Sequence, residues 1–304
     1  MKTSTLRSDL LLLLSAVIWG LAFVAQRIGM DYVGPFTYTG VRFLLGGLSL
    51  IPLLYIFPYS APHTKPKPLS PFWMKWGGLL AGLILCTGMA FQQMGLQYTT
   101  AGKAGFLTGL YVVLVPVFGL VVRHKTGPGT WIGVILSVCG MYFLSITGNL
   151  QISKGDLLII ISTLFWAFHV LTIGWLSPYN HPIKLSIQQF LTAGSISLLI
   201  AFGFETVHIS SIWQAAIPIL YGGLFSVGIA FTLQVVVQKT AHPAHAAIIM
   251  SLETVFAAVG GWLILHEHLS SRALLGCVLM LCGMIIAQLN DWIFKMIKNQ
   301  YLLK

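Results

Sequence analysis

Two ionisable side chains lie inside long apolar stretches of this 304-residue sequence. They are Arg42, within residues 36–57, and Glu253, within residues 243–265. An ionisable group at the depth of a lipid bilayer costs about 2.5–3.5 kcal/mol on insertion scales, so it usually faces a cavity or a partner. Arg42 could hold a carboxylate or gate the outer mouth of a cavity, and Glu253 could bind a cation, an amine or a coupling proton. Alternatively, each could cap backbone carbonyls or pair with another helix and keep a bundle in register.

A histidine and several amides are further polar candidates. His169 follows Trp166 by three residues, so the two side chains share a helix face. The imidazole could carry a coupling proton or form a hydrogen bond between helices. Amides in apolar surroundings suit the recognition of neutral polar groups, although bonding between helices explains them equally well. They are Gln92, Gln93, Gln189 and Gln234.

Aromatic side chains complete the candidate set. Trp19, Tyr111 and Trp166 could line a cavity and stack on an apolar or aromatic ligand, or they could simply pack in the core. The residues that we consider for binding a solute or a coupling ion are Trp19, Arg42, Gln93, Tyr111, Trp166, His169, Gln189 and Glu253.

The elements that must position these residues are apolar helices. Charged residues make up 8% of the chain, hydrophobic residues 57%, and the mean hydropathy is +0.86, whereas an ordinary soluble domain has about 25% charged residues. A helix needs about 20 mostly apolar residues to cross a bilayer. The sequence therefore predicts an all-α integral membrane protein with ten transmembrane helices. Their ranges are about 9–27, 36–57, 73–93, 102–122, 129–147, 156–176, 183–203, 212–236, 243–265 and 272–290.

The formal charge of +10 does not indicate nucleic-acid binding, because the basic residues are spread thinly between apolar runs and form no basic face. Their distribution indicates membrane topology instead. Most of the 17 basic residues fall in connections on the same side as the N-terminus. The positive-inside rule then places both termini in the cytoplasm, and we expect a multi-pass protein of the plasma (inner) membrane. The basic residues on the other side are Arg27, Lys103, Lys154 and Arg272.

The sequence contains an internal repeat. A shift of 147 residues aligns Asp9 with Asp156 and Trp19 with Trp166, and a shift of 143 aligns Cys139-Gly140-Met141 with Cys282-Gly283-Met284. Each half holds five spans, an odd number, so the second half must enter the membrane upside down relative to the first. Such inverted repeats occur in many secondary transporters, which bind substrate near the midplane. We expect repeats at 1–147 and 148–290, followed by a cytoplasmic tail at 291–304.

Several short motifs lie along the apolar runs. They are Trp19-Gly20, Arg42-Phe43, Phe106 to Tyr111 continuing to Val115 to Phe118, Ser251 to Ala257, and Leu265 to Leu269. Together they resemble the motifs of the EamA-domain family of the drug/metabolite transporter superfamily, from which the chain differs at Thr254, where proline is common, and at His124, where an acidic residue is expected. The resemblance covers essentially the whole chain as two EamA-like repeats, and it implies ten helices around a central cavity and alternating access for small metabolites, often by export.

The leading hypothesis is therefore a secondary transporter for small organic metabolites. A phosphorylated substrate would need several basic side chains in the cavity, and only Arg42, with Lys103 as a second candidate, is available. This favours amino acids or other neutral, zwitterionic or lipophilic solutes. A membrane-embedded enzyme and a channel-like scaffold without carrier activity are the alternatives.

No enzyme is expected, because the sequence carries neither an HExxH motif nor a nucleophile elbow. Catalytic residues, cofactors and metals are not expected, since the histidine pairs His242/His245 and His266/His268 lack further ligands. The expected partners are a small-molecule substrate and the lipid bilayer, without nucleic acid, and a homodimer is left open.

Overall fold

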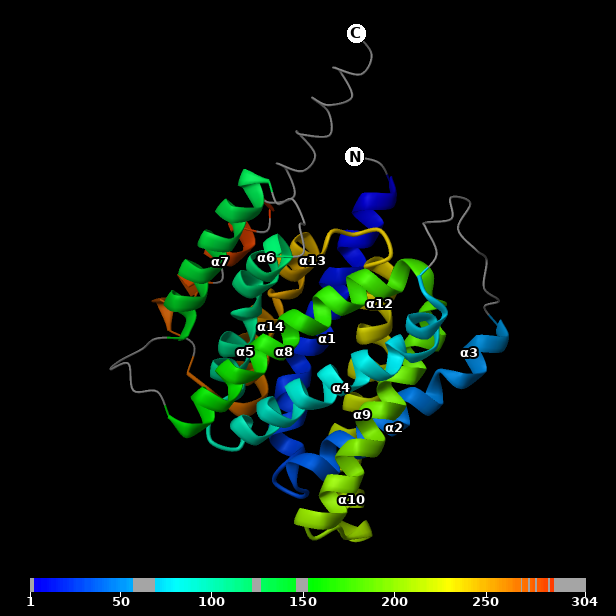
Figure 1. The fold of residues 1–304 in the computed structure, drawn as a ribbon. Coiled ribbons are helices and arrows are strands. Elements are labelled where there is room, and N and C mark those ends of the chain that lie inside the picture. Colours follow the sequence, from blue (N-terminus) through cyan, green and yellow to red (C-terminus); the bar gives the residue numbers. More distant parts are fainter. Residues whose placement is uncertain are drawn as a thin grey trace.

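The computed structural model describes residues 3–56, 69–121, 127–145, 153–268 and 270–286 except 273, 277 and 284. The expected cytoplasmic tail, 291–304, lies outside these residues. Every described element is helical (Figure 1). The elements are α1 (Thr3–Gly29), α2 (Pro35–Ser49), α3 (Ile51–Ile56), α4 (Pro71–Leu96), α5 (Ala101–Gly109), α6 (Tyr111–Val121), α7 (Pro128–Ser145), α8 (Lys154–Leu176), η1 (Ser177–Tyr179), α9 (Pro182–Phe204), α10 (Ile209–Gln214), α11 (Ala216–Leu220), η2 (Tyr221–Phe231), α12 (Thr232–Val237), α13 (Pro243–Met250) and α14 (Glu253–Leu265).

Eight helical stretches in the described residues are long and apolar enough to span a membrane. The expected count of ten is not confirmed within these residues. The stretches expected at 129–147 and 272–290, which extend beyond the described residues, contribute shorter apolar helices at Pro128–Gly140 and Leu274–Gly283. The eight spans are Leu6–Gly29, Pro35–Ile56, Pro71–Leu96, Ala101–Val121, Lys154–Tyr179, Pro182–Phe204, Ala216–Val237 and Pro243–Leu265.

Local sequence explains where many helices begin. Proline occupies the first turn of α2, α4, α9 and α13, where its missing N–H costs nothing and its fixed φ suits a helix. Helix α8 instead begins with a capping box in which the Ser153 side chain accepts from the Asp156 N–H, and the Asp156 carboxylate accepts from the Ser153 N–H. The residue at which each helix begins determines the height of its polar side chains along the helix axis.

The two halves of the chain pack intimately against each other. Helix α1 packs along α14 and η2, α4 packs against α8 and α9, and α2 packs against α9 and η2. In Figure 1, α1 runs through the middle of the bundle, while α7 lies at its edge and α10 at the end away from the N-terminus. The core between the helices therefore combines side chains from both halves.

The contact between α1 and α14 depends on Gly20. A Cβ placed at Gly20 would lie 2.7 Å from the Glu253 carbonyl oxygen and 2.8 Å from the Ala257 nitrogen. Small residues allow such close approach of membrane helices. This contact brings α1 directly against the first turn of α14, where Glu253 begins the helix.

The element η2 is a π-helix of 11 residues. Side chains of α1 donate hydrogen bonds to its carbonyls: Ser15 Oγ to the Ala230 oxygen at 3.2 Å and Trp19 Nε1 to the Ser226 oxygen at 3.3 Å. Most π-helices are single-turn bulges and are frequent at functional sites. Here the wide helix presents Ser226 and Phe231 to the interior beside α1.

Candidate functional site

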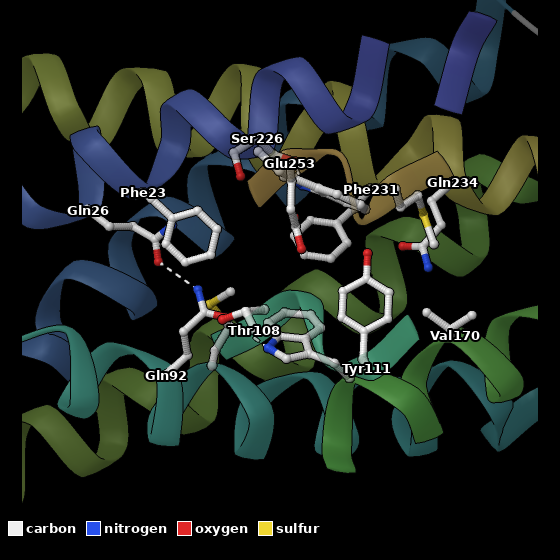
Figure 2. A pocket seen from close by; sticks show the side chains of 14 residues that line it. Phe23, Gln26, Gln92, Thr108, Tyr111, Val170, Ser226, Phe231, Gln234 and Glu253 are labelled. Atoms are coloured by element: carbon white, nitrogen blue, oxygen red, sulfur yellow. Dashed lines mark hydrogen bonds between the residues drawn. The ribbon is translucent and has the colours of Figure 1, made fainter. Parts of the chain in front are cut away.

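A cavity lies in the interior of the bundle, lined by elements of both halves of the chain (Figure 2). The space between its walls is about 440 Å³, counted with the open space at its edge. Five lining residues are aromatic, namely Trp19, Phe23, Tyr111, Trp166 and Phe231. The other lining residues are Gln26, Met89, Gln92, Thr108, Val170, Ser226, Gln234, Met250 and Glu253. Four of the eight residues considered for binding, Trp19, Tyr111, Trp166 and Glu253, thus meet in one place, together with the amides Gln92 and Gln234.

Two interrupted helices contribute to this cavity. Leu110 separates α5 from α6, and residues 251–252 separate α13 from α14. Thr108 and Tyr111 flank the first interruption, and Met250 and Glu253 flank the second; both pairs line the cavity. The backbone stays paired through bonds such as Val113 N to Leu110 O and Thr254 N to Ser251 O, both 3.1 Å. Tyr111 and Glu253 are each the first residue of the second segment, α6 and α14 respectively.

Glu253 is the only acidic side chain among the residues lining the cavity. It is 5% exposed and forms no ion pair with any residue that the structure describes. The Tyr111 hydroxyl points toward its carboxyl group from the facing wall (Figure 2). A buried carboxylate without a cation is costly, so this side chain must bind a proton or a cation when the cavity is dry.

A chain of hydrogen bonds connects Arg42 to the cavity wall. Arg42 Nη2 donates to Gln26 Oε1 at 3.5 Å, and Gln92 Nε2 donates to the same oxygen at 3.3 Å. Trp166 Nε1 in turn donates to Gln92 Oε1 at 2.8 Å. Arg42 itself is fully buried and does not line the cavity, although its guanidinium contacts Gln26 and Met89, which do.

Gln26 did not emerge from the sequence as a candidate. It lies in the last part of an apolar stretch next to Arg27, so its only signal is a single amide near a span end. In the structure it is 3% exposed, and its amide nitrogen donates to the Ala22 carbonyl at 3.1 Å. Gln26 therefore acts as the link between Arg42 and the other amides of the wall.

His169, Gln189 and Gln93, which were also considered for binding, lie outside the cavity lining. His169 Nε2 is 2.8 Å from Gln189 Oε1, which joins α8 to α9, and both side chains are fully buried. This geometry matches the hydrogen bond between helices that was one alternative for His169. Gln93 is also fully buried, and neither atom of its amide has a hydrogen-bond partner among the described residues.

Two ion pairs lie at opposite ends of the bundle. His245 Nε2 is 3.0 Å from Asp9 Oδ1, and Lys103 Nζ is 2.7 Å from Asp156 Oδ2. Near Lys103, Glu267 accepts from the N–H groups of Ala101 at 3.0 Å and Gly102 at 3.2 Å. Because His245 and Glu267 lie at the two ends of the span Pro243–Leu265, the ion pairs flank the cavity from both sides.

Like Glu267 at the start of α5, Glu205 caps the start of a helix, in this case α2, which follows the end of α1. Glu205 follows α9 and accepts from the N–H groups of Phe36 and Thr37, each at 2.8 Å, in the first turn of α2. A carboxylate at this position satisfies free backbone donors and interacts favourably with the helix dipole. Glu205 and Glu267 therefore each fasten an element of the second half to the start of a helix of the first half.

The apolar spans and the internal cavity define the class: this is a multi-pass helical membrane protein. The model of the EamA-like transporter family matches residues 6–146 and 153–288, once for each half. The chain belongs to this family, and the names of its relatives indicate a transporter and not an enzyme.

Similar proteins cover nearly the whole chain. An uncharacterized transporter of Archaeoglobus fulgidus is 32% identical over 94% of this chain and 87% of its own length. The uncharacterized transporter YoaV of Bacillus subtilis is 26% identical over 89% of this chain and 92% of its own. The uncharacterized inner membrane transporter YedA of Escherichia coli K12 is 26% identical over 91% and 89%. A solved crystal structure superposes with a TM-score of 0.74 at 18% identity, covering 94% of this chain and 98% of that one, which shows the shared fold.

Proposed function

We propose that this protein is a secondary transporter that moves a small organic solute across the membrane by alternating access. The observation that carries the proposal is the cavity built by both halves of the chain. It contains five aromatic rings and an acidic side chain that forms no ion pair with any residue the structure describes. Ligand pockets are typically about 300–1,000 Å³, mostly apolar, with a few polar groups that orient the ligand. The cavity lining has this composition, with mostly apolar or aromatic side chains, several polar groups and one carboxyl group.

An inverted repeat of two five-helix units, 1–147 and 148–290, accounts for the way the helices pair. Helix α8 is the counterpart of α1 in the second half. Helix α1 packs on η2 and α14 of the second half, and α8 packs in the same way on α4, α5 and α6 of the first half. Helix α2 packs on its own counterpart, α9. This reciprocity is what a two-fold axis between the halves would produce. It supports a mechanism in which the halves rock against each other around the cavity.

The ion pairs fit the same arrangement. Asp9 and Asp156 are repeat-related, and each binds a base near the start of an interrupted helix, His245 in α13 and Lys103 in α5. We propose that the two pairs close the cavity alternately, one on each side of the membrane. If the protein lies in the inner membrane with both termini in the cytoplasm, the Asp9–His245 pair closes the cytoplasmic side of the cavity. The Lys103–Asp156 pair then closes the outer side.

The chemistry of the cavity limits the substrate. None of its lining residues is basic, and Lys103 is already paired with Asp156. Phosphorylated solutes would leave a dianion without cations. Amino acids or other neutral, zwitterionic or lipophilic solutes fit better, and we propose that they are exported.

The test of carrier activity is counterflow in proteoliposomes. Vesicles loaded with an unlabelled candidate solute should accelerate the entry of the same labelled solute, because a carrier exchanges faster than it returns empty. Passive flux that does not respond to internal solute would identify a channel. Release of a chemically altered product would identify an enzyme. The absence of protein-dependent flux for a broad panel of metabolites would contradict the proposal.

Removing the positive charge of Lys103 should favour opening at its end of the bundle. In Lys103→Met, we expect a single cysteine at Phe23→Cys, in a background without native cysteines, to react about two- to fivefold faster with a membrane-impermeant maleimide applied from that side. This range follows from the modest free energy of a partly exposed ion pair. Phe23 is 2% exposed in the structure, so the label requires opening.

The control is Arg27→Gln, which removes an exposed pair with Asp31 within α1 and should leave labelling unchanged. His245→Gln, at the opposite end, should lower the labelling rate from the Lys103 side. Equal rates in Lys103→Met and the unaltered protein would show that this ion pair does not close the cavity.

A further inference from the structure

We infer that the transported solute carries a cationic amine on an apolar or aromatic body, with the amine bound by Glu253 and the neighbouring acceptors of the cavity. The inference rests on the proposed transport function and narrows its substrate class. It follows from the balance of hydrogen-bond donors and acceptors in the cavity wall, from the absence of a cationic partner for Glu253 among the described residues, and from the arrangement of the rings.

Two buried polar atoms of the wall that can accept a hydrogen bond have no partner among the described residues. Gln234 Oε1 is buried without a hydrogen-bond partner among the described residues, and the same holds for Thr108 Oγ1, whose hydroxyl can also accept. Both residues line the cavity together with Glu253. Buried polar atoms are nearly always satisfied in folded proteins, so this set calls for a ligand that brings N–H donors.

Four nitrogen donors of the wall are already used. Trp19 Nε1 donates to the Ser226 carbonyl and Trp166 Nε1 to Gln92 Oε1. The amide nitrogens of Gln26 and Gln92 donate to the Ala22 carbonyl and to Gln26 Oε1. A solute carboxylate or phosphate would find neutral hydroxyl and amide donors but no cation in the lining, whereas an ammonium group would find the Glu253 carboxyl group and Gln234 Oε1.

The charges near the cavity favour the same ligand. Glu253 has no ion-pair partner in the described part of the chain. The positive charge of Arg42 does not line the cavity; its guanidinium lies 5.2 Å from the ring centroids of Tyr38 and of Phe43. A cation on the solute would neutralise Glu253, while an anion would add a second negative charge to a poorly solvated site.

The rings provide a surface for the rest of the molecule. The Phe231 ring stacks on Trp166 with centroids 6.0 Å apart and lies 4.6 Å from the Trp19 ring at a tilt of 57°. Such faces hold a flat apolar body, and a cation above them gains a further electrostatic attraction. Glu253 and Tyr111 project into the space beside these rings (Figure 2), so one small molecule can reach both the carboxyl group and the aromatic faces.

The test compares four probes that share one ring but differ in charge: phenethylamine, 2-phenylethanol, phenylacetate and phenylalanine. Binding to the full-length protein in lipid nanodiscs is followed by the fluorescence of its tryptophans, two of which line the cavity. Phenethylamine should bind about 10- to 100-fold more tightly than the alcohol or the acid, the range expected for hydrogen bonds to a charged group. Phenylalanine should lie between, because its ammonium group can bind Glu253 while its carboxylate finds no cation in the lining.

The variants assign the preference to the cavity. Glu253→Gln should make the affinities for phenethylamine and 2-phenylethanol equal within about threefold, while Glu253→Asp should keep the preference for the amine. Asp31→Asn removes one negative charge from an exposed ion pair and should change neither affinity. Tighter or equal binding of the acid or alcohol in the unaltered protein, no binding of any probe, or a preference that survives in Glu253→Gln would overturn the inference.

Counterflow separates this inference from the transport function. Exchange of amines but not of phenylacetate in proteoliposomes supports both. Exchange of phenylacetate or 2-phenylethanol in preference to the amine leaves the protein a carrier and rejects the substrate class. Absence of exchange for these probes and for a broad metabolite panel contradicts the transport function itself.

Discussion

Replacement of Arg42 by methionine should reduce transport at least about tenfold and leave the protein folded, with an unchanged or higher melting temperature. The guanidinium is fully buried, and its Nε and Nη1 atoms have no hydrogen-bond partner among the described residues. Replacing a poorly compensated buried charge by an apolar side chain is often neutral or stabilising. Transport should fall because Arg42 holds Gln26, whose oxygen also binds Gln92 in the cavity wall.

Two measurements decide the role of Arg42. Thermal unfolding in detergent reports stability, and counterflow per unit of folded protein reports function. Arg27→Met serves as the control, because Arg27 forms an exposed pair with Asp31 and should affect neither quantity. A large loss of thermal stability in Arg42→Met would make Arg42 a structural residue, and full transport activity would remove it from the functional site.

Gly20→Val should prevent the bundle from folding correctly. A side chain at this position would collide with Phe256 and with the backbone of Glu253 and Ala257, forcing α1 away from α14. Overpacking typically costs about 1–3 kcal/mol, and here two backbones would have to separate. We expect a lower yield of monodisperse protein, a lower melting temperature and loss of counterflow.

Gly203→Val is the matched control for this substitution. Gly203 also lies in a long helix, α9, but a Cβ there meets no atom within 4 Å. Its yield, melting temperature and transport should stay close to those of the unaltered protein. Equal losses in both variants would point to helix propensity and not to the contact between α1 and α14 as the cause.

The sequence could predict the helices but not all of their internal structure. Long apolar runs determine spans because the bilayer requires them, so the all-helical architecture followed from composition. The interruptions at Leu110 and at residues 251–252, and the π-helix at Tyr221–Phe231, left no comparable signal. They depend on packing between helices that are distant in the chain, which hydropathy does not encode.

The sequence predicted some residues of the candidate site and missed others. Glu253 and Trp166 were found because an acid in an apolar run and a repeated tryptophan are rare, and both line the cavity. Gln26, near the end of its span, and Ser226, in the middle of its span, were missed, because single amides and hydroxyls are common in membrane helices. Arg42 was found by its charge, but its sequence position does not show that Gln26 and Met89 lie between its guanidinium and the cavity.

The different side chains of Tyr111 and Glu253 have a consequence for direction. Each begins the second segment of an interrupted helix, and two identical side chains at these places would let a solute bind equally well in either of two orientations. A phenol on one side and a carboxyl group on the other remove that degeneracy. The solute then has one preferred orientation, and in the proposed transport cycle the inward-open and outward-open sites differ in affinity. A cavity lined by two halves of one chain can in this way favour release on one side of the membrane.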